Sequence, residues 1–202
     1  MTWVIIGLGN PDEQYARTRH NAGRMAVQKF ALLYDFGEWK EDSKSKSFIG
    51  RGLVERSVTV AVLPNTYMNK TGSAAAHYIK PARPGSVKGA EKLIAVYDDL
   101  DLPLGTIKVS FDRGSGGHRG IDSIMTALKT KKFVRIRIGI SPVSAKGVAK
   151  KPEGEKDVEK FILGEFKADE MAQLKSVFKR VSEALKTIIM EGREIAMNRF
   201  NQ

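Results

Sequence analysis

Apolar residues form short continuous runs at several points of the chain. The runs at 3–8, "WVIIGL", and at 92–105, "KLIAVYDDLDLPLG", are of this kind. Such runs are typical of strands that are buried on both faces of a sheet. Further strands are expected as a pair at 45–55 and 57–63, at 106–111, and at 133–140, where apolar and basic residues alternate.

Between these strands, apolar residues recur at steps of three and four, which is the spacing of one helix face. A helix is predicted after Asn21, whose side chain could cap it, and a short helix is predicted over 70–80. The expected buried faces consist of Ala22, Met25, Ala26, Phe30 and Leu33; of Ile121, Ile124, Met125 and Leu128; and, in a long amphipathic helix, of Met171, Leu174, Val177, Phe178, Val181, Leu185, Ile188 and Ile189.

The alternation of strands and helices predicts an α/β fold with helices on both faces of a sheet. The chain of 202 residues fits a single domain, 1–202. Residues 141–157 are rich in proline, glycine and lysine, which predicts a flexible basic loop within that domain. Ligands of such sheets bind beyond the carboxyl ends of the strands. Asn10, Asp98 and the glycine loop 113–120 all follow predicted strands, so the site is expected there.

The chain carries an excess of positive charge. It has 34 lysine and arginine residues against 23 acidic residues, a formal net charge of +11, which favours a polyanionic partner such as nucleic acid. The absence of cysteine excludes disulfides and thiolate-bound zinc. The apolar run at 3–8 is too short for a signal peptide or a membrane span, so a soluble, cytoplasmic protein is expected.

Two nucleotide-binding motifs are excluded by the sequence. The segment "GLGNPD" lacks the third glycine of the dinucleotide-binding fingerprint, because that position is Asp12. No segment matches the phosphate-binding loop of nucleoside triphosphatases. The glycine-containing turn after the first strand therefore predicts a different kind of site.

The three histidines are candidates for acid–base chemistry. His20 lies between a polar loop and a helix start, where the helix dipole is expected to lower its pKa and keep it available as a base. His118 lies in the glycine loop, close to any ligand that this loop admits. His77 lies inside a predicted helix and is interpreted as structural.

The segment "YDDLD" supplies three carboxylates and has two interpretations. Asp98 could orient His20 and stabilise its charged form, or the cluster could bind Mg²⁺ for phosphoryl chemistry. Strand alternation directs Asp98 away from Asp99 and Asp101, so the three carboxylates cannot all converge. The pairing of His20 with Asp98 is the preferred interpretation.

No serine or cysteine lies in a recognisable nucleophile elbow. Asn69 could cap the helix predicted at 70–80, or it could hold a peptide-like group, because its amide both donates and accepts hydrogen bonds. A histidine–aspartate pair with amide side chains and no nucleophile indicates direct attack by an activated water on an ester or amide.

Six segments taken together resemble the bacterial-type peptidyl-tRNA hydrolases. They are "GLGNP", "TRHNAG", "PNTYMNKTG", "DDLDLPLG", "GSGGHRG" and "RIRIGI", in the order and spacing of that family, over about residues 3–190. The resemblance implies a monomeric α/β domain with a twisted mixed sheet. It also implies hydrolysis of the ester that joins a peptide to the 3′ ribose of tRNA, which recycles tRNA from stalled or abandoned translation, without a metal or other cofactor.

Carried over position by position, the resemblance assigns roles to individual residues. His20 would activate the water, and Asp98 would hold and polarise His20. Substrate-binding positions would be Asn10, Tyr15, Asn69, Gly116, Gly117, His118 and Arg119; Arg137 would meet tRNA phosphate with Lys108 and Arg113 nearby; and Lys146, Lys150 and Lys151 are further candidate contacts.

This chain departs from the family pattern at two positions. Arg119 replaces an asparagine that positions substrate and water, and arginine can donate a hydrogen bond but cannot accept one. Ser110 stands where the family has a phosphate-binding lysine. These differences bear on turnover and on the grip on tRNA more than on the class of reaction.

Two alternative functions remain open at this point. The first is an RNA-binding module that resembles plant-organelle splicing factors of the same fold, for which Arg119 would mark a loss of hydrolysis. The second is a magnesium-dependent phosphohydrolase built on the "DDLD" cluster.

Overall fold

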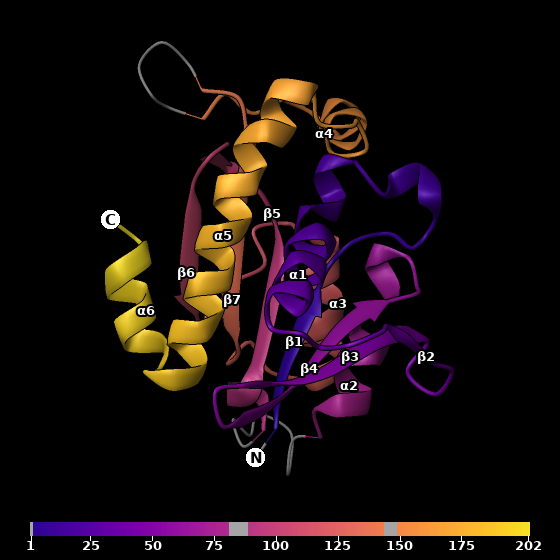
Figure 1. Ribbon diagram of the computed structural model, residues 1–202. Helices are drawn as coiled ribbons and strands as arrows, with labels where there is room; N and C mark the ends of the chain where they lie inside the picture. Colours follow the sequence, from indigo (N-terminus) through magenta and orange to yellow (C-terminus); the bar gives the residue numbers. More distant parts are fainter. Residues whose placement is uncertain (1, 81–88, 144–148) are drawn as a thin grey trace.

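The computed structural model describes residues 2–80, 89–143 and 149–202, and its strands form one mixed sheet (Figure 1). The strand order is β2-β3-β4-β1-β5-β7-β6. Neighbouring strands are parallel from β4 through β1 and β5 to β7, whereas β2, β3 and β4 pair antiparallel, as do β6 and β7. The strands are β1 (Trp3–Gly7), β2 (Lys40–Asp42), β3 (Ser47–Val54), β4 (Ser57–Pro64), β5 (Leu93–Pro103), β6 (Ile107–Phe111) and β7 (Val134–Ser141).

Helices cover both faces of the sheet, which confirms the predicted α/β architecture (Figure 1). α1 (Ala22–Leu33), α5 (Ala168–Met190) and α6 (Arg193–Phe200) pack on one face, and α2 (Gly72–Tyr78) and α3 (Arg119–Leu128) pack on the other. α4 (Glu155–Ile162) lies beyond one end of the sheet. The 3₁₀ turns are η1 (Glu13–Tyr15), η2 (Arg19–Asn21), η3 (Met68–Lys70) and η4 (Ala90–Lys92).

The central strands are buried on both sides, as their continuous apolar runs predict. Every residue of β1 is buried. Ile5 packs with the core under α1 and α5, whereas Val4 and Ile6 pack with the core under α2 and α3. The sheet therefore separates two apolar layers.

The predicted face of α1 is correct except at its last residue. Ala22, Ala26 and Phe30 are fully buried, but Leu33 is 61% exposed. The helix ends at Leu33, and Phe36, which packs edge-on against Phe30, fills the core at this point instead.

The two later amphipathic helices have the predicted buried faces. In α3 these are Ile121, Ile124 and Leu128, with Met125 packed at the margin. In α5, the predicted positions from Leu174 to Ile189 are buried, and Met171 packs at the edge of the core.

Two helices were not predicted from the sequence. α4 begins at Glu155, so the loop predicted at 141–157 is wrong at its carboxyl end, and residues 144–148 of it lie outside the described residues. α4 contains no fully buried residue, and in α6 only Ala196 and Phe200 are buried. Neither helix therefore shows a long apolar period. In the part of the chain that the structure describes, no helix is long and apolar enough to cross a bilayer.

A close helix–strand contact fixes the beginning of α1. A Cβ atom on Gly23 would lie 2.1 Å from the carbonyl oxygen of Val96 in β5, so only glycine fits there. The Arg24 N–H donates to the Leu8 carbonyl (2.9 Å), just after β1. These contacts place His20, two residues before the helix, at the carboxyl ends of β1 and β5.

Candidate active site

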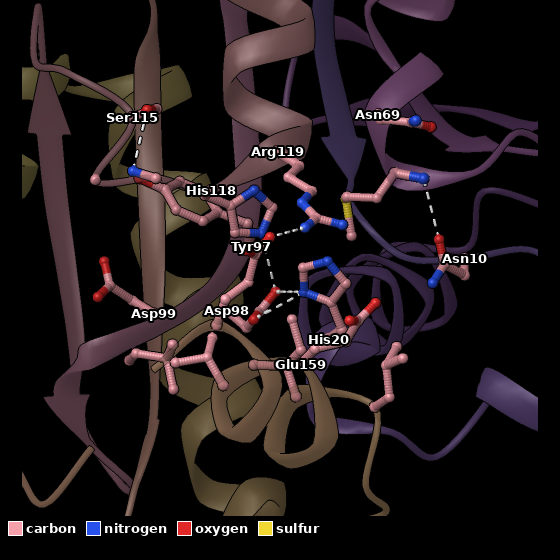
Figure 2. Close-up of a pocket in the computed structure, with 18 of the residues that line it drawn as sticks. Asn10, His20, Asn69, Tyr97, Asp98, Asp99, Ser115, His118, Arg119 and Glu159 are labelled. Atoms are coloured by element: carbon pink, nitrogen blue, oxygen red, sulfur yellow. Dashed lines mark hydrogen bonds and ion pairs between the residues drawn. The ribbon is translucent and has the colours of Figure 1, made fainter. Parts of the chain in front are cut away.

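A cavity of about 610 Å³ opens at the carboxyl ends of β1 and β5 (Figure 2). The loop that leads into α3 forms one wall and α4 forms another. The residues predicted for catalysis and substrate binding all line it: Asn10, Tyr15, His20, Asn69, Asp98, Gly116, Gly117, His118 and Arg119.

The turn that carries His20 is fastened to the segment between α4 and α5. Thr18 forms an isolated antiparallel bridge with Glu165. The buried guanidinium of Arg19 donates to Glu170 at 2.8 Å. Arg19 was not predicted from the sequence to have a role near the site, and it fixes the backbone next to His20.

His20 and Asp98 form a buried pair, as predicted. The His20 Nδ1 atom lies 3.0 Å from each oxygen of the Asp98 carboxylate, and both side chains are nearly inaccessible to solvent. A carboxylate only accepts hydrogen bonds, so Nδ1 carries the proton. In the neutral imidazole this leaves the Nε2 lone pair of His20, a residue that lines the cavity, free to accept a proton.

His118 also binds Asp98, an arrangement that the sequence did not predict (Figure 2). The His118 Nδ1 atom caps α3, because it accepts hydrogen bonds from the N–H groups of Gly120 (3.2 Å) and Ile121 (3.3 Å). Its proton must then be on Nε2, which donates to Asp98 Oδ1 at 3.1 Å. The amides of α3 thus fix the tautomer of His118, and His118 in turn fixes Asp98.

The pKa values of His20 and Asp98 depend on each other. Burial acts to lower the pKa of His20, but the charge and hydrogen bond of Asp98 outweigh it and hold the pKa above its ordinary value, while Arg119 acts in the lowering direction. The prediction that a helix start lowers this pKa is therefore wrong, because the adjacent carboxylate dominates over a single 3₁₀ turn. Burial acts to raise the pKa of Asp98, but the imidazoles of His20 and His118 hold it well below its ordinary value.

Asn10 is held by a reciprocal pair of hydrogen bonds with Asn21. Asn21 accepts from the Asn10 N–H and donates to the Asn10 carbonyl, both at 2.9 Å, so the predicted capping of α1 by its side chain is wrong. The Asn10 Oδ1 atom accepts from the Met68 N–H at 3.0 Å. The amide nitrogen of Asn10 is therefore left as the group that can donate to a ligand.

Asn69 and Tyr67 also line the cavity. Asn69 belongs to η3 and its side chain makes no capping hydrogen bond to α2, whose first flanking residue is Thr71. Tyr67 is half exposed and donates to Asp12 at 3.0 Å. Tyr67 was missed from the sequence, although it stands in the same polar segment as Asn69.

The three carboxylates of "YDDLD" engage three different partners. Asp98 binds the two imidazoles, Asp99 accepts a hydrogen bond from Arg137, and Asp101 pairs with Lys151 at 2.6 Å. The geometry therefore does not support the magnesium cluster of the alternative hypothesis. Ligand atoms of His20, Asp98 and His118 do lie within 4.8 Å of one another, a grouping that can hold a metal ion, but here imidazole N–H groups donate to the carboxylate.

The predicted phosphate-binding residues Arg137, Lys108 and Arg113 are not among the residues that line the cavity, but Arg137 contacts Asp99, which does line it. Lys108 of β6 stands directly opposite Arg137 of β7, so both side chains point to the same face of the sheet. Ser110 is buried opposite Arg135, whose guanidinium donates to the Gly114 carbonyl at 2.7 Å under the glycine loop. Arg113 and Lys150 are exposed, and Lys146 lies outside the described residues.

Comparisons with known proteins identify the family of the chain. The family model for peptidyl-tRNA hydrolase matches residues 4–202. The chain is 38% identical over 205 residues to a peptidyl-tRNA hydrolase of Chloroflexus aggregans, which covers 98% of both chains. It is 34% identical over 200 residues to that of Syntrophotalea carbinolica, covering 98% of this chain and 96% of the relative.

A solved structure shares the fold. The crystal structure of peptidyl-tRNA hydrolase from Acinetobacter baumannii matches with a TM-score of 0.83 and 29% identity, over 99% of this chain and 94% of that one. The similarity in fold therefore extends over nearly the whole length of both chains. The chain belongs to the peptidyl-tRNA hydrolase family.

Proposed function

We propose that this protein hydrolyses peptidyl-tRNA through a water molecule activated by His20. The observation that carries the proposal is the orientation of one imidazole: Nδ1 is bound to Asp98, so the proton-accepting Nε2 is the free nitrogen. A base must be neutral and within reach of the proton that it removes. The buried carboxylate supports the second condition, because it fixes the ring, and it stabilises the positive charge that the ring acquires. It also raises the pKa of His20, so the first condition is met at a pH above that raised value.

The proposed reaction needs no covalent intermediate on the protein. His20 Nε2 takes a proton from water while the water oxygen bonds to the ester carbonyl carbon. The tetrahedral intermediate then collapses, the bond to the 3′ oxygen of the ribose breaks, and the proton on Nε2 passes to that oxygen. The products are tRNA with a 3′ hydroxyl group and a free peptide carboxylic acid, which releases its proton to solvent to become a carboxylate. No metal or other cofactor takes part in the proposed step.

The amide side chains of the cavity would hold the substrate on either side of the ester. Asn10 presents its amide nitrogen because Met68 occupies its oxygen. We expect Asn10 to donate to the ester-linked residue and Asn69 to hold the next peptide group. Tyr15 would line the path of the 3′ end, and Gly116 and Gly117 would lie beside the peptide, where their open surroundings leave room for it.

The charge of the chain supports a polynucleotide as the larger part of the substrate. The net charge is +11, and the exposed Lys108 lies on the same face of the sheet as Arg137, whose guanidinium also pairs with Asp99. Lys108, Arg137 and Arg113 are our candidates for the contact with tRNA phosphates. Lys108 would take over the role of the family's phosphate-binding lysine, whose position is occupied by Ser110 in this chain. In the cell, such an enzyme would work as a cytoplasmic monomer and recycle tRNA from stalled translation.

The experiment is a single-turnover assay that measures release of a labelled N-acetylaminoacyl group from tRNA in the presence of a chelator. We expect rapid release by the native protein and release slowed by about 10³-fold in His20→Ala, with tRNA affinity unchanged. His77→Ala, which removes the half-exposed histidine of α2, is the matched control. Normal release by His20→Ala would refute the base, and tRNA binding without release by the native protein would indicate an RNA-binding module.

A further inference from the structure

Arg119 occupies the boundary between two hollows of the surface. It is the first residue of α3, and it lines the cavity that holds His20. It also lines a second groove of about 480 Å³ between α2 and α3. Asn69 is the other residue that borders both. A substrate that extends from the first cavity into the groove must pass between these two side chains.

Among the residues that the structure describes, the guanidinium of Arg119 has one partner, and the contact is weak. It donates to Glu155, the first residue of α4, at 2.9 Å. The two side chains are 61% and 83% exposed, respectively. An ion pair that is open to water contributes little to stability, so a better anion can displace Glu155 at small cost.

The groove beyond Arg119 is lined by small side chains. Its walls carry Ser73, Ser123, Thr126 and Ala127 together with the carboxylate of Asp122, and no large apolar side chain is present among its described residues. The part of the first cavity under α4 is different, because the large side chains of Leu100, Val158 and Ile162 contribute apolar surface there. Peptide side chains fit that apolar end, which leaves the side of Arg119 for the sugar–phosphate chain. Because Asp122 is acidic, the guanidinium of Arg119 is the group of this lining that can hold a phosphate.

The chemistry of the proposed substrate then identifies the anion. Close to the ester, a peptidyl-tRNA carries one charged group, the phosphodiester on the 5′ side of the terminal adenosine. A guanidinium matches a phosphate with two parallel N–H donors, which an asparagine amide cannot supply. We propose that Arg119 binds this phosphodiester and thereby determines specificity for a nucleotide-linked ester, and that Glu155 competes with the phosphate for the same guanidinium. This inference rests on the proposed hydrolysis of peptidyl-tRNA.

The test compares two small esters under identical conditions. One is the 3′ N-acetylaminoacyl ester of adenosine, which has no phosphate, and the other is the same ester of cytidylyl-(3′→5′)-adenosine, which has one. We expect the native protein to prefer the second ester in kcat/KM by about tenfold, the size of one charged hydrogen-bonded contact. In Arg119→Asn the preference should fall close to one, while the ester of adenosine is still cleaved.

Two further variants sharpen the measurement. Glu155→Gln frees the guanidinium, so the preference should rise by about twofold, within the range of an exposed pair. Arg56→Asn removes an exposed arginine from the turn between β3 and β4 and should keep the native ratio. A native ratio in Arg119→Asn would overturn the assignment. Failure of the native protein to cleave either ester, or peptidyl-tRNA itself, would instead count against the proposed function.

Discussion

The floor and the rim of the cavity are both built from charged side chains, but they are held in different ways. On the floor, Asp98 receives hydrogen bonds from His20 and His118, and all three side chains are at least nine-tenths buried. At the rim, the pair of Arg119 with Glu155 is open to solvent. On the floor, buried hydrogen bonds hold Asp98 and both imidazoles in one arrangement, whereas the rim can exchange its partners. In our two proposals the reaction chemistry belongs to the floor, and substrate selection belongs to the rim.

The largest effect should come from changing the acceptor on the floor. Asp98→Asn places an amide, in part a donor, against His20 Nδ1, so the imidazole would turn its proton toward the cavity. We expect the single-turnover rate to fall by roughly 10³-fold or more, the effect of replacing an orienting carboxylate by an amide. Asp112→Asn, in the loop after β6, is the control. A loss below tenfold would show that the carboxylate does not set the tautomer.

A smaller effect is expected from His118→Asn. Asparagine can cap α3 in place of His118, but its shorter side chain is expected not to reach Asp98. The melting temperature should therefore stay near the native value, while the rate falls by about tenfold through the lost charged hydrogen bond. His118→Ala removes the cap as well, so both the melting temperature and the single-turnover rate should fall. Equal rates in the native protein and His118→Asn would restrict His118 to a structural role.

The contact with tRNA provides a test outside the cavity. Arg137→Ala should weaken tRNA binding several-fold and reduce the slope of log affinity against log salt concentration by about 1, since one phosphate contact is lost. The rate at saturating protein should stay unchanged. Lys29→Ala, on the exposed side of α1, is the matched control. An unchanged slope in Arg137→Ala would remove this residue from the interface.

The smallest expected effect is a shift in the pH dependence of kcat/KM, which would show that Arg119 at the rim acts on His20 on the floor. His20 must be neutral to accept a proton, and its pKa is raised above 6.5, so kcat/KM should fall as the pH drops through that raised value. Arg119 lowers the pKa of His20, so Arg119→Asn should move the acid limb to higher pH. A profile that moves to lower pH, or does not move, would contradict this coupling.

Much of the fold could be predicted from the spacing of apolar residues, because the buried positions of β1, α3 and α5 repeat with the period of the strand or helix that carries them. α4 could not be predicted in this way, since no residue of it is fully buried. The His20–Asp98 pair could be predicted because a histidine after the first strand and a carboxylate late in the next parallel strand come to the same edge of the sheet, although Asp98 lies within β5 and not after it. The binding of Asp98 by His118 could not, because it depends on which ring nitrogen the amides of α3 occupy.

Asn21 shows why local rules fail at such a site. Its position before α1 is typical of a cap, yet its side chain binds the backbone of Asn10, eleven residues earlier. Only the folded loop brings these two residues together, and the buried backbone groups of Asn10 are satisfied by this side chain.

The bridge between Thr18 and Glu165 has a consequence for how a polymer reaches the cavity. α4 is anchored at its carboxyl end, next to His20, while its first residue is held across the cavity by the exchangeable contact of Glu155 with Arg119. The two ends of this wall are therefore held with different strength. A long substrate laid across the rim would compete with one exposed ion pair, while the turn that carries His20 would keep its own anchor.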